Sequence, residues 1–147
     1  MRENSSEITK YIHIARENHK KGNIYQANEI YKKLINQKIY TYELLFSYGL
    51  FCKEINNLKI AKNLFNLSIK KYPSKINAYL LLAEILRKEN KVNDALKTLY
   101  AAKKIEKSNP DIDYNLSISY KTTKSFREAL LSIAVSYTHL RAHETIL

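Results

Sequence analysis

The stretch INAYLLLAEILRKENKVNDALKTLYAAKKIEKSN, residues 76–109, contains a pattern of small and large residues that recurs along the chain. One of its alanines belongs to a column spaced by 34 residues: Ala27, Ala61, Ala95 and Ala129. Four residues after each alanine lies a large apolar residue: Tyr31, Phe65, Leu99 and Ile133. Twelve residues before each alanine lies a small residue: Ala15, Gly49, Ala83 and Ser117. A period of 34 residues with constant small and large positions indicates an array of stacked helical hairpins.

The period divides the chain into four units, 8–41, 42–75, 76–109 and 110–135. Within each unit, apolar residues at three- and four-residue steps predict two helices. A short polar break separates them, at residues 21–23, 55–57, 89–91 and 123–125. Three of these breaks contain Gly or Asn, which tolerate the left-handed conformation that ends a helix. We therefore predict an all-α fold, an α-solenoid of about four stacked antiparallel helical hairpins.

These columns resemble the signature of the tetratricopeptide repeat (TPR) family. Unit 76–109 carries it most fully, with Tyr79, Leu82, Ala83 and Leu86 followed by Ala95 and Leu99. The resemblance covers about residues 8–135, with departures at Asn18 and Asp113. It implies a right-handed superhelix in which the first helix of each hairpin lines a concave surface.

The two ends of the chain differ from the units. Residues 1–7 precede the first unit, and we expect an N-terminal leader there. In residues 136–147, the string SYTHLRAHET lacks the Lys, Asn and Ile that dominate the rest of the chain. It resembles translated sequencing-adapter read-through, so we expect a non-native tail; the alternative is a genuine terminal segment. On the first interpretation the fourth unit is cut short, and the chain is an N-terminal fragment of a larger protein.

The net charge of +11 has two interpretations. One is a nucleic acid or an acidic partner. The other, which we favour, is codon usage, because Lys, Asn, Ile and Tyr are all abundant and all have A/T-rich codons. We find no apolar run long enough to span a bilayer and no secretory signal. The single cysteine fits a reducing compartment, so we expect a cytoplasmic protein that does not bind membranes.

We expect no catalytic, cofactor-binding or metal-binding residues. Two glycines cannot build a phosphate-binding loop, and the sequence lacks HExxH, CxxC and GxSxG motifs. Cys52 lies among apolar residues, where a cysteine usually packs as a small hydrophobic side chain. The sequence therefore predicts a binding scaffold and not an enzyme.

The concave surface is the candidate partner groove, since the family resemblance assigns positions of each first helix to it. The candidate residues are Ile12, Arg16, His19, Phe46, Leu50, Lys53, Leu80, Glu84, Arg87, Tyr114, Ile118 and Lys121. One position of the repeat gives a ladder of basic residues: His19, Lys53, Arg87 and Lys121. Another gives an apolar floor: Ile12, Phe46, Leu80 and Tyr114. This pattern predicts a protein or peptide partner with hydrophobic anchors and carboxylates, although cations at helix C-termini also stabilise the helix itself.

Two alternatives to a protein-interaction scaffold stay open. A basic helical solenoid could bind RNA, but the lysine pairs at 32–33, 70–71 and 103–104 fall on the second helices, away from the groove. The chain could also be the non-catalytic front of a glycosyltransferase or sulfotransferase, by analogy with other repeat arrays. The Lys/Asn/Arg set with which chaperone-docking TPR domains bind a C-terminal carboxylate is not present. The sequence does not predict the oligomeric state.

Overall fold

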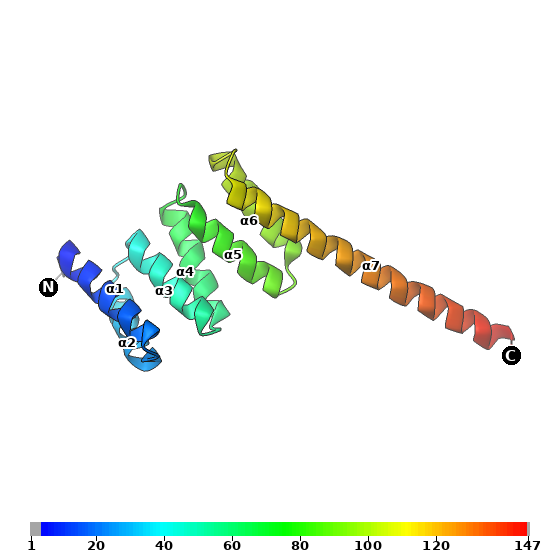
Figure 1. The fold of residues 1–147 in the computed structure, drawn as a ribbon, viewed down its shortest axis with the longest axis horizontal. Helices are drawn as coiled ribbons and strands as arrows, with labels where there is room; N and C mark the ends of the chain where they lie inside the picture. The colour runs from blue at the N-terminus through cyan, green and yellow to red at the C-terminus, as the bar shows by residue number, and fades with distance from the viewer. Residues whose placement is uncertain (1–3, 147) are drawn as a thin grey trace.

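The computed structural model describes residues 4–146, which form seven α-helices and no strand. The helices are α1 (Ser5–Lys20), α2 (Ile24–Asn36), α3 (Tyr42–Glu54), α4 (Leu58–Lys71), α5 (Ile76–Lys88), α6 (Val92–Ile105) and α7 (Pro110–Ile146). The first six form three antiparallel hairpins that stack side by side, and α7 continues the stack (Figure 1). The predicted helical solenoid is confirmed.

A left-handed residue reverses the chain inside each hairpin. Gly22, Asn56 and Asn90, each 34 residues from the next, have φ angles of 80°, 63° and 60°. The backbone N–H of the following residue then donates to a carbonyl five residues back, at 2.8 Å for Asn23, 2.7 Å for Asn57 and 2.8 Å for Lys91. This is the Schellman arrangement, which satisfies the last carbonyl groups of a helix. The residue type at this one position therefore sets the turn.

The small and large columns meet inside each hairpin. Ala27, Ala61 and Ala95 are fully buried, and so are Phe65 and Leu99. At Gly49 the two helices approach so closely that a Cβ atom would lie 2.7 Å from Cε1 of the Phe65 ring. A small residue on the first helix is therefore needed opposite the large residue on the second.

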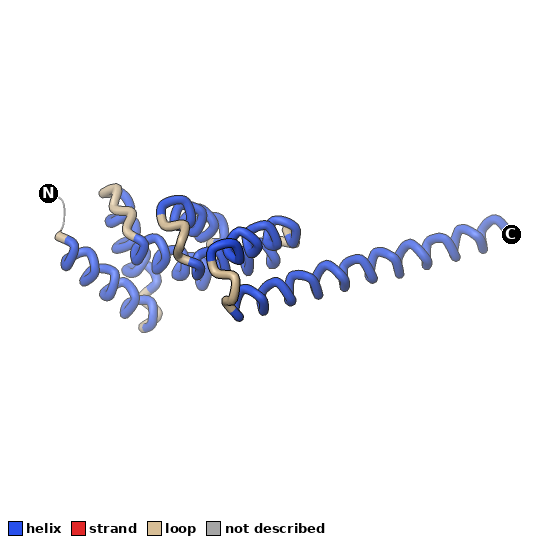
Figure 2. Tube along the Cα trace, turned by 90° about the horizontal axis from the view of Figure 1, so that it is seen from above, coloured by secondary structure: helices blue, strands red, loops and turns tan. Residues whose placement is uncertain are grey.

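The fourth unit differs from the prediction. Helix α7 runs without a break from Pro110 to Ile146, so the predicted turn at 123–125 and the second helix after it are absent. Lys124 stands where the other units have Gly22, Asn56 and Asn90. Thr-Lys-Ser is polar but contains no residue that favours a positive φ, so nothing in it stops a helix. Beyond the stack, α7 projects as a single rod (Figures 1 and 2), and Ile133, from the large column, is 66% exposed.

The helices form two layers. The odd-numbered helices contact one another in the order α1, α3, α5 and α7, whereas among the described residues α2 does not touch α4, and α4 does not touch α6. The even-numbered helices contact only odd-numbered ones. Since the odd-numbered helices pack closer together, their outer side is the concave side of the stack.

The apolar interior consists of two clusters. The first extends from α1 to α5 and is rich in aromatic residues, with stacked rings of Tyr31 and Tyr48 at 5.0 Å between centroids. The second joins α5, α6 and α7 and is mainly aliphatic, with Leu99 and Ile112 at its centre. Its one tyrosine, Tyr79, donates its hydroxyl hydrogen to the carbonyl of Pro73 at 2.9 Å.

Candidate partner groove

The candidate groove lies along the odd-numbered helices, which hold all twelve predicted residues. Eleven of them are at least partly exposed. The exception is Ile12, which is 0% exposed and belongs to the first apolar cluster. Assigning Ile12 to the groove was therefore wrong. It lies at the foot of α1, where α1 has no preceding hairpin but does pack on both α2 and α3.

A hollow of about 370 Å³ lies between α1 and α3. Four of the predicted residues line it, Arg16, His19, Phe46 and Leu50, together with other residues that include Ser47 and Glu54. The Phe46 ring stacks on Tyr42, with 5.5 Å between centroids, which fixes the apolar wall of the hollow. The hollow thus combines an apolar wall with charged groups at its edge.

Polar contacts join α1 to α3 along the edge of this hollow. The Arg16 guanidinium donates to Ser47 Oγ at 2.5 Å and lies 3.5 Å from a carboxylate oxygen of Glu43. His19 Nε2 lies 3.3 Å from Glu54 Oε2, and its ring packs edge-on against Phe51 at 5.0 Å. Both cationic positions of α1 therefore contact the next hairpin.

Between α3 and α5 the contact is an ion pair. Lys53 Nζ lies 2.8 Å from Glu84 Oε2, and Lys88 Nζ lies 3.0 Å from the other oxygen of the same carboxylate. Burial alone would raise the pKa of Glu84, but the hydrogen bonds from Lys53 and Lys88 outweigh burial and hold the pKa below its ordinary value. Glu84 is therefore ionised at neutral pH and neutralises the Lys53 charge.

Arg87 joins α5 to α7 in a different way. Its guanidinium donates to Asn115 Oδ1 at 3.0 Å and to Ser119 Oγ at 3.4 Å. Within the described part of the chain, Arg87 forms no ion pair. Burial lowers the pKa of Arg87, while the charge of Glu84 raises it. Arg87 is thus a partly buried cation held by neutral oxygens, with guanidinium N–H groups left for a ligand.

The predicted basic ladder therefore acts first within the molecule. His19, Lys53 and Arg87 each reach the next odd-numbered helix. The sequence analysis missed these partners. A signal was present, since Arg16 and Ser47, like Lys53 and Glu84, are 31 residues apart, which is one repeat less about one helical turn.

The remaining candidates extend the surface onto α5 and α7. Leu80 packs against the second apolar cluster and is half-buried, as is Ile118. Tyr114 is 66% exposed and Lys121 is exposed. The structure thus gives the groove two parts, a hollow between α1 and α3 and an open surface around Arg87 and Tyr114.

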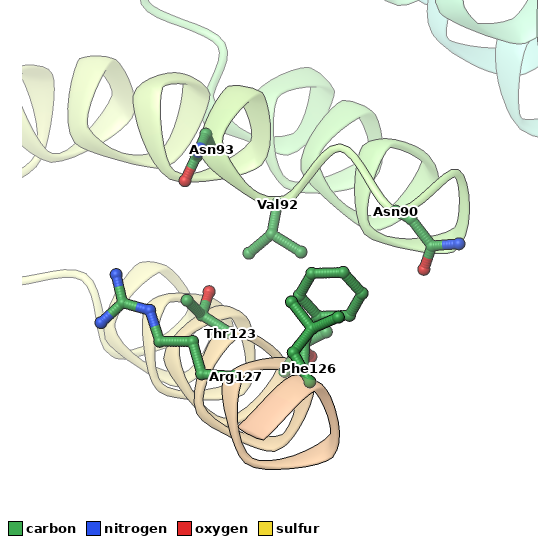
Figure 3. Close-up of a pocket in the computed structure, with 8 residues that line it drawn as sticks. Asn90, Val92, Asn93, Thr123, Phe126 and Arg127 are labelled. Atoms are coloured by element: carbon green, nitrogen blue, oxygen red, sulfur yellow. The ribbon is translucent and has the colours of Figure 1, made fainter. Parts of the chain in front are cut away.

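A second hollow, of about 390 Å³, lies outside the predicted groove. It is formed where α7 passes the turn between α5 and α6, and Val92 faces the ring of Phe126 across it (Figure 3). Its lining comes from this turn, the start of α6 and the middle of α7. No resemblance or motif assigned these residues a role.

The described residues contain no group of three or more His, Cys, Asp and Glu side chains able to hold a metal ion. Cys52 is buried, and burial raises the pKa of its thiol to about 12. A thiol in this state is a poor nucleophile. None of the helices described is long and apolar enough to cross a bilayer.

No protein-family model matches the chain, and no curated protein matches it. Solved structures do. The first TPR domain of Spaghetti (RPAP3), bound to the HSP90 peptide SRMEEVD, superposes with a TM-score of 0.71 at 16% identity over 83% of this chain and 99% of that one.

Two further structures show the same architecture. The Yersinia enterocolitica type III secretion chaperone SycD, in complex with a peptide of the translocator YopD, gives a TM-score of 0.68 at 12% identity over 86% of this chain and 96% of that one. The Thermobaculum terrenum O-GlcNAc transferase gives 0.65 at 16% identity, over 78% of this chain but 22% of that one. The chain therefore has a TPR-like fold.

Proposed function

We propose that this chain is a protein-interaction scaffold that binds an extended peptide along its odd-numbered helices. The observation that carries the proposal is the combination of an apolar-walled hollow between α1 and α3 with a partly buried arginine that lacks an ionic partner among the described residues. Two of the similar structures contain a bound peptide, which supports this kind of partner.

The hollow accounts for the hydrophobic part of the partner. Phe46 and Leu50 line it and are both half-buried, so an apolar peptide side chain that enters would remove further apolar surface from water. Each buried methylene contributes about 0.8 kcal/mol, so one aliphatic side chain would contribute about 2 kcal/mol.

Arg87 accounts for the acidic part. The ion pair with Glu84 neutralises Lys53, so Lys53 has little charge to offer a ligand. Arg87 contacts only the neutral oxygens of Asn115 and Ser119, and a guanidinium can bind a carboxylate with two parallel hydrogen bonds. Hydrogen bonds to charged groups contribute about 1.5–3 kcal/mol. We therefore infer a peptide with an apolar residue for the hollow and a carboxylate for Arg87.

The proposal is tested by selecting binders from a displayed library of random peptides and measuring the affinity of the selected peptides by fluorescence anisotropy. We expect selected peptides to contain both aliphatic and acidic residues. Arg87→Gln should weaken their binding about tenfold or more, and Leu50→Glu should weaken it comparably. Lys97→Gln, which removes an exposed charge from α6 in the outer layer, is the matched control and should leave binding unchanged.

Two results would contradict the proposal. One is a set of selected peptides without acidic residues, whose binding Arg87→Gln leaves intact while circular dichroism shows a folded variant. The other is strong, salt-dependent binding of a random RNA oligonucleotide that is lost when Lys70 and Lys71 of α4 are replaced, since this would favour the nucleic-acid alternative.

A further inference from the structure

One face of α7 is uncovered although the same face is buried in every other odd-numbered helix. Ala15, Gly49 and Ala83 are buried under the second helix of their own hairpins. Ser117, the next member of this column, is exposed because no second helix folds back onto α7. The opposite face of α7 is occupied, since Ile112 and Leu116 are buried against the α5–α6 hairpin.

The side chains that would cover this face are present in the chain but point to solvent. Phe126, Ala129 and Ile133 continue the columns that are buried in α2, α4 and α6. All three are exposed, Phe126 by 63% and Ile133 by 66%. Leu130, between them, is 51% exposed. The chain thus has both halves of one more hairpin interface, held apart by a straight helix.

The residue at the missing turn explains why the two halves do not meet within one chain. A fold-back needs a left-handed residue at position 124, where the other units have Gly22, Asn56 and Asn90 with φ between 60° and 80°. A lysine can adopt this conformation, as Lys38 does at φ 58°, but for residues with a Cβ atom it is unfavourable. A continuous helix at 123–125 avoids it.

We propose that α7 pairs antiparallel with the α7 of a second copy of this chain, so that residues 126–135 of each copy cover the Ser117 face of the other. The register follows from the hairpins themselves. Gly49 lies against Phe65, so the centre of that pairing falls at residue 57. One period later Ser117 of one copy lies against Ile133 of the other, and the two-fold axis passes near Ser125.

This pairing satisfies both observations with one arrangement. The helix stays straight at Lys124, and the exposed column residues become buried in the same kind of contact as in the other hairpins. Both copies use the same surface, which closes the assembly at two subunits. All residues that it uses lie before residue 136, so it does not depend on the final segment of the chain.

The first test is the mass of the full chain in solution, measured by light scattering over a series of concentrations. We expect twice the chain mass of 17.2 kDa. Ile133→Glu places a charge in the proposed contact and should raise the dissociation constant of the dimer about tenfold or more. Leu131→Glu, an equally exposed leucine on the other side of α7, is the control and should leave the dimer intact. A monomer at all concentrations would overturn the proposal.

The second test separates exchange between copies from a fold-back within one chain. Ser117→Cys and Ile133→Cys are made in separate chains, refolded together and treated with a short bismaleimide, with the unsubstituted chain as the control for Cys52. A cross-linked dimer that contains one copy of each variant is expected. If instead the double variant cross-links only within a monomer, the two halves meet in the same chain and the proposal fails.

A third variant tests the argument from the turn. Lys124→Gly restores a residue that favours the left-handed conformation and should shift the population from dimer towards monomer. A dimer fraction that is unchanged in this variant would contradict the reasoning.

Discussion

Replacing Gly49 with alanine tests the close approach of α3 and α4, on which the repeat pattern depends. The added methyl carbon would lie 2.7 Å, 3.0 Å and 3.1 Å from three carbons of the Phe65 ring. Carbon atoms in ordinary contact are about 3.5–4.0 Å apart. Phe65 is fully buried and its ring lies against Phe46, with 6.2 Å between centroids, so the ring cannot move away freely.

Two opposing effects decide the size of the change. Forcing an extra methyl group into a packed core costs about 1–3 kcal/mol. Alanine in place of glycine inside a helix gains about 1 kcal/mol. We therefore expect Gly49→Ala to lower the free energy of unfolding by about 1 kcal/mol. At an exposed helical site the same substitution would raise it.

The measurement is urea unfolding followed by far-UV circular dichroism, analysed with a nearest-neighbour model because stacked hairpins can unfold in turn. A loss of 1 kcal/mol corresponds to a midpoint about 0.5 M lower. The control is the same substitution in a Phe65→Leu background, where the clash is removed. There Gly49→Ala should be neutral or stabilising, which gives a coupling energy of about 1–3 kcal/mol between the two positions.

The reasoning is refuted if Gly49→Ala stabilises the protein in both backgrounds by the same amount. That result would mean that the two helices have room for a methyl group and that helix propensity alone decides the effect.

Three further predictions concern a turn, a thiol and an ion pair. Gly22→Ala should cost about 1 kcal/mol because φ is 80°, whereas Gly22→Asn should cost less, as Asn56 and Asn90 adopt similar angles; equal losses on thermal unfolding would contradict this. The Cys52 thiol, with a pKa of about 12, should react with a disulfide reagent far more slowly in the native than in the unfolded protein, and similar rates would show an accessible thiol. The pKa of Glu84 is lowered in the folded state, so the stability that this carboxylate contributes is present above its ordinary pKa of 4.5 and is lost as the pH falls through the lowered value. Glu84→Gln should cost about 1 kcal/mol or less at neutral pH and flatten the acid side of the stability curve, and an unchanged acid side in urea unfolding at stepped pH would contradict the assignment.

The hairpins could be predicted from the sequence because their contacts repeat. Each pair of small and large residues, such as Gly49 and Phe65, meets within one hairpin, so the same spacing recurs with every unit. The turns were predictable for the same reason wherever Gly or Asn occupies the left-handed position. At residues 123–125 the prediction rested on polarity alone, and polarity does not end a helix.

The groove was predictable in outline but not in its electrostatics. The repeat positions brought Arg16, His19, Phe46 and Leu50 to one hollow, as expected. The charges could not be paired from spacing within a helix, because Lys53 finds Glu84 on a helix of the next unit. Ile12 was misassigned because its repeat position is open in later units, whereas α1 and its neighbours bury it completely.

The division of the interior into an aromatic and an aliphatic cluster gives the stack a weak end. All of the ring-to-ring contacts in the described part of the chain lie between His19 and Tyr72. Local opening therefore begins at α7 and α6, whose amide protons should exchange with solvent before those of α3 and α4. A chain frayed in this way loses the Arg87 surface while the hollow between α1 and α3 persists, so grip on an acidic group would vanish at temperatures where grip on an apolar one survives.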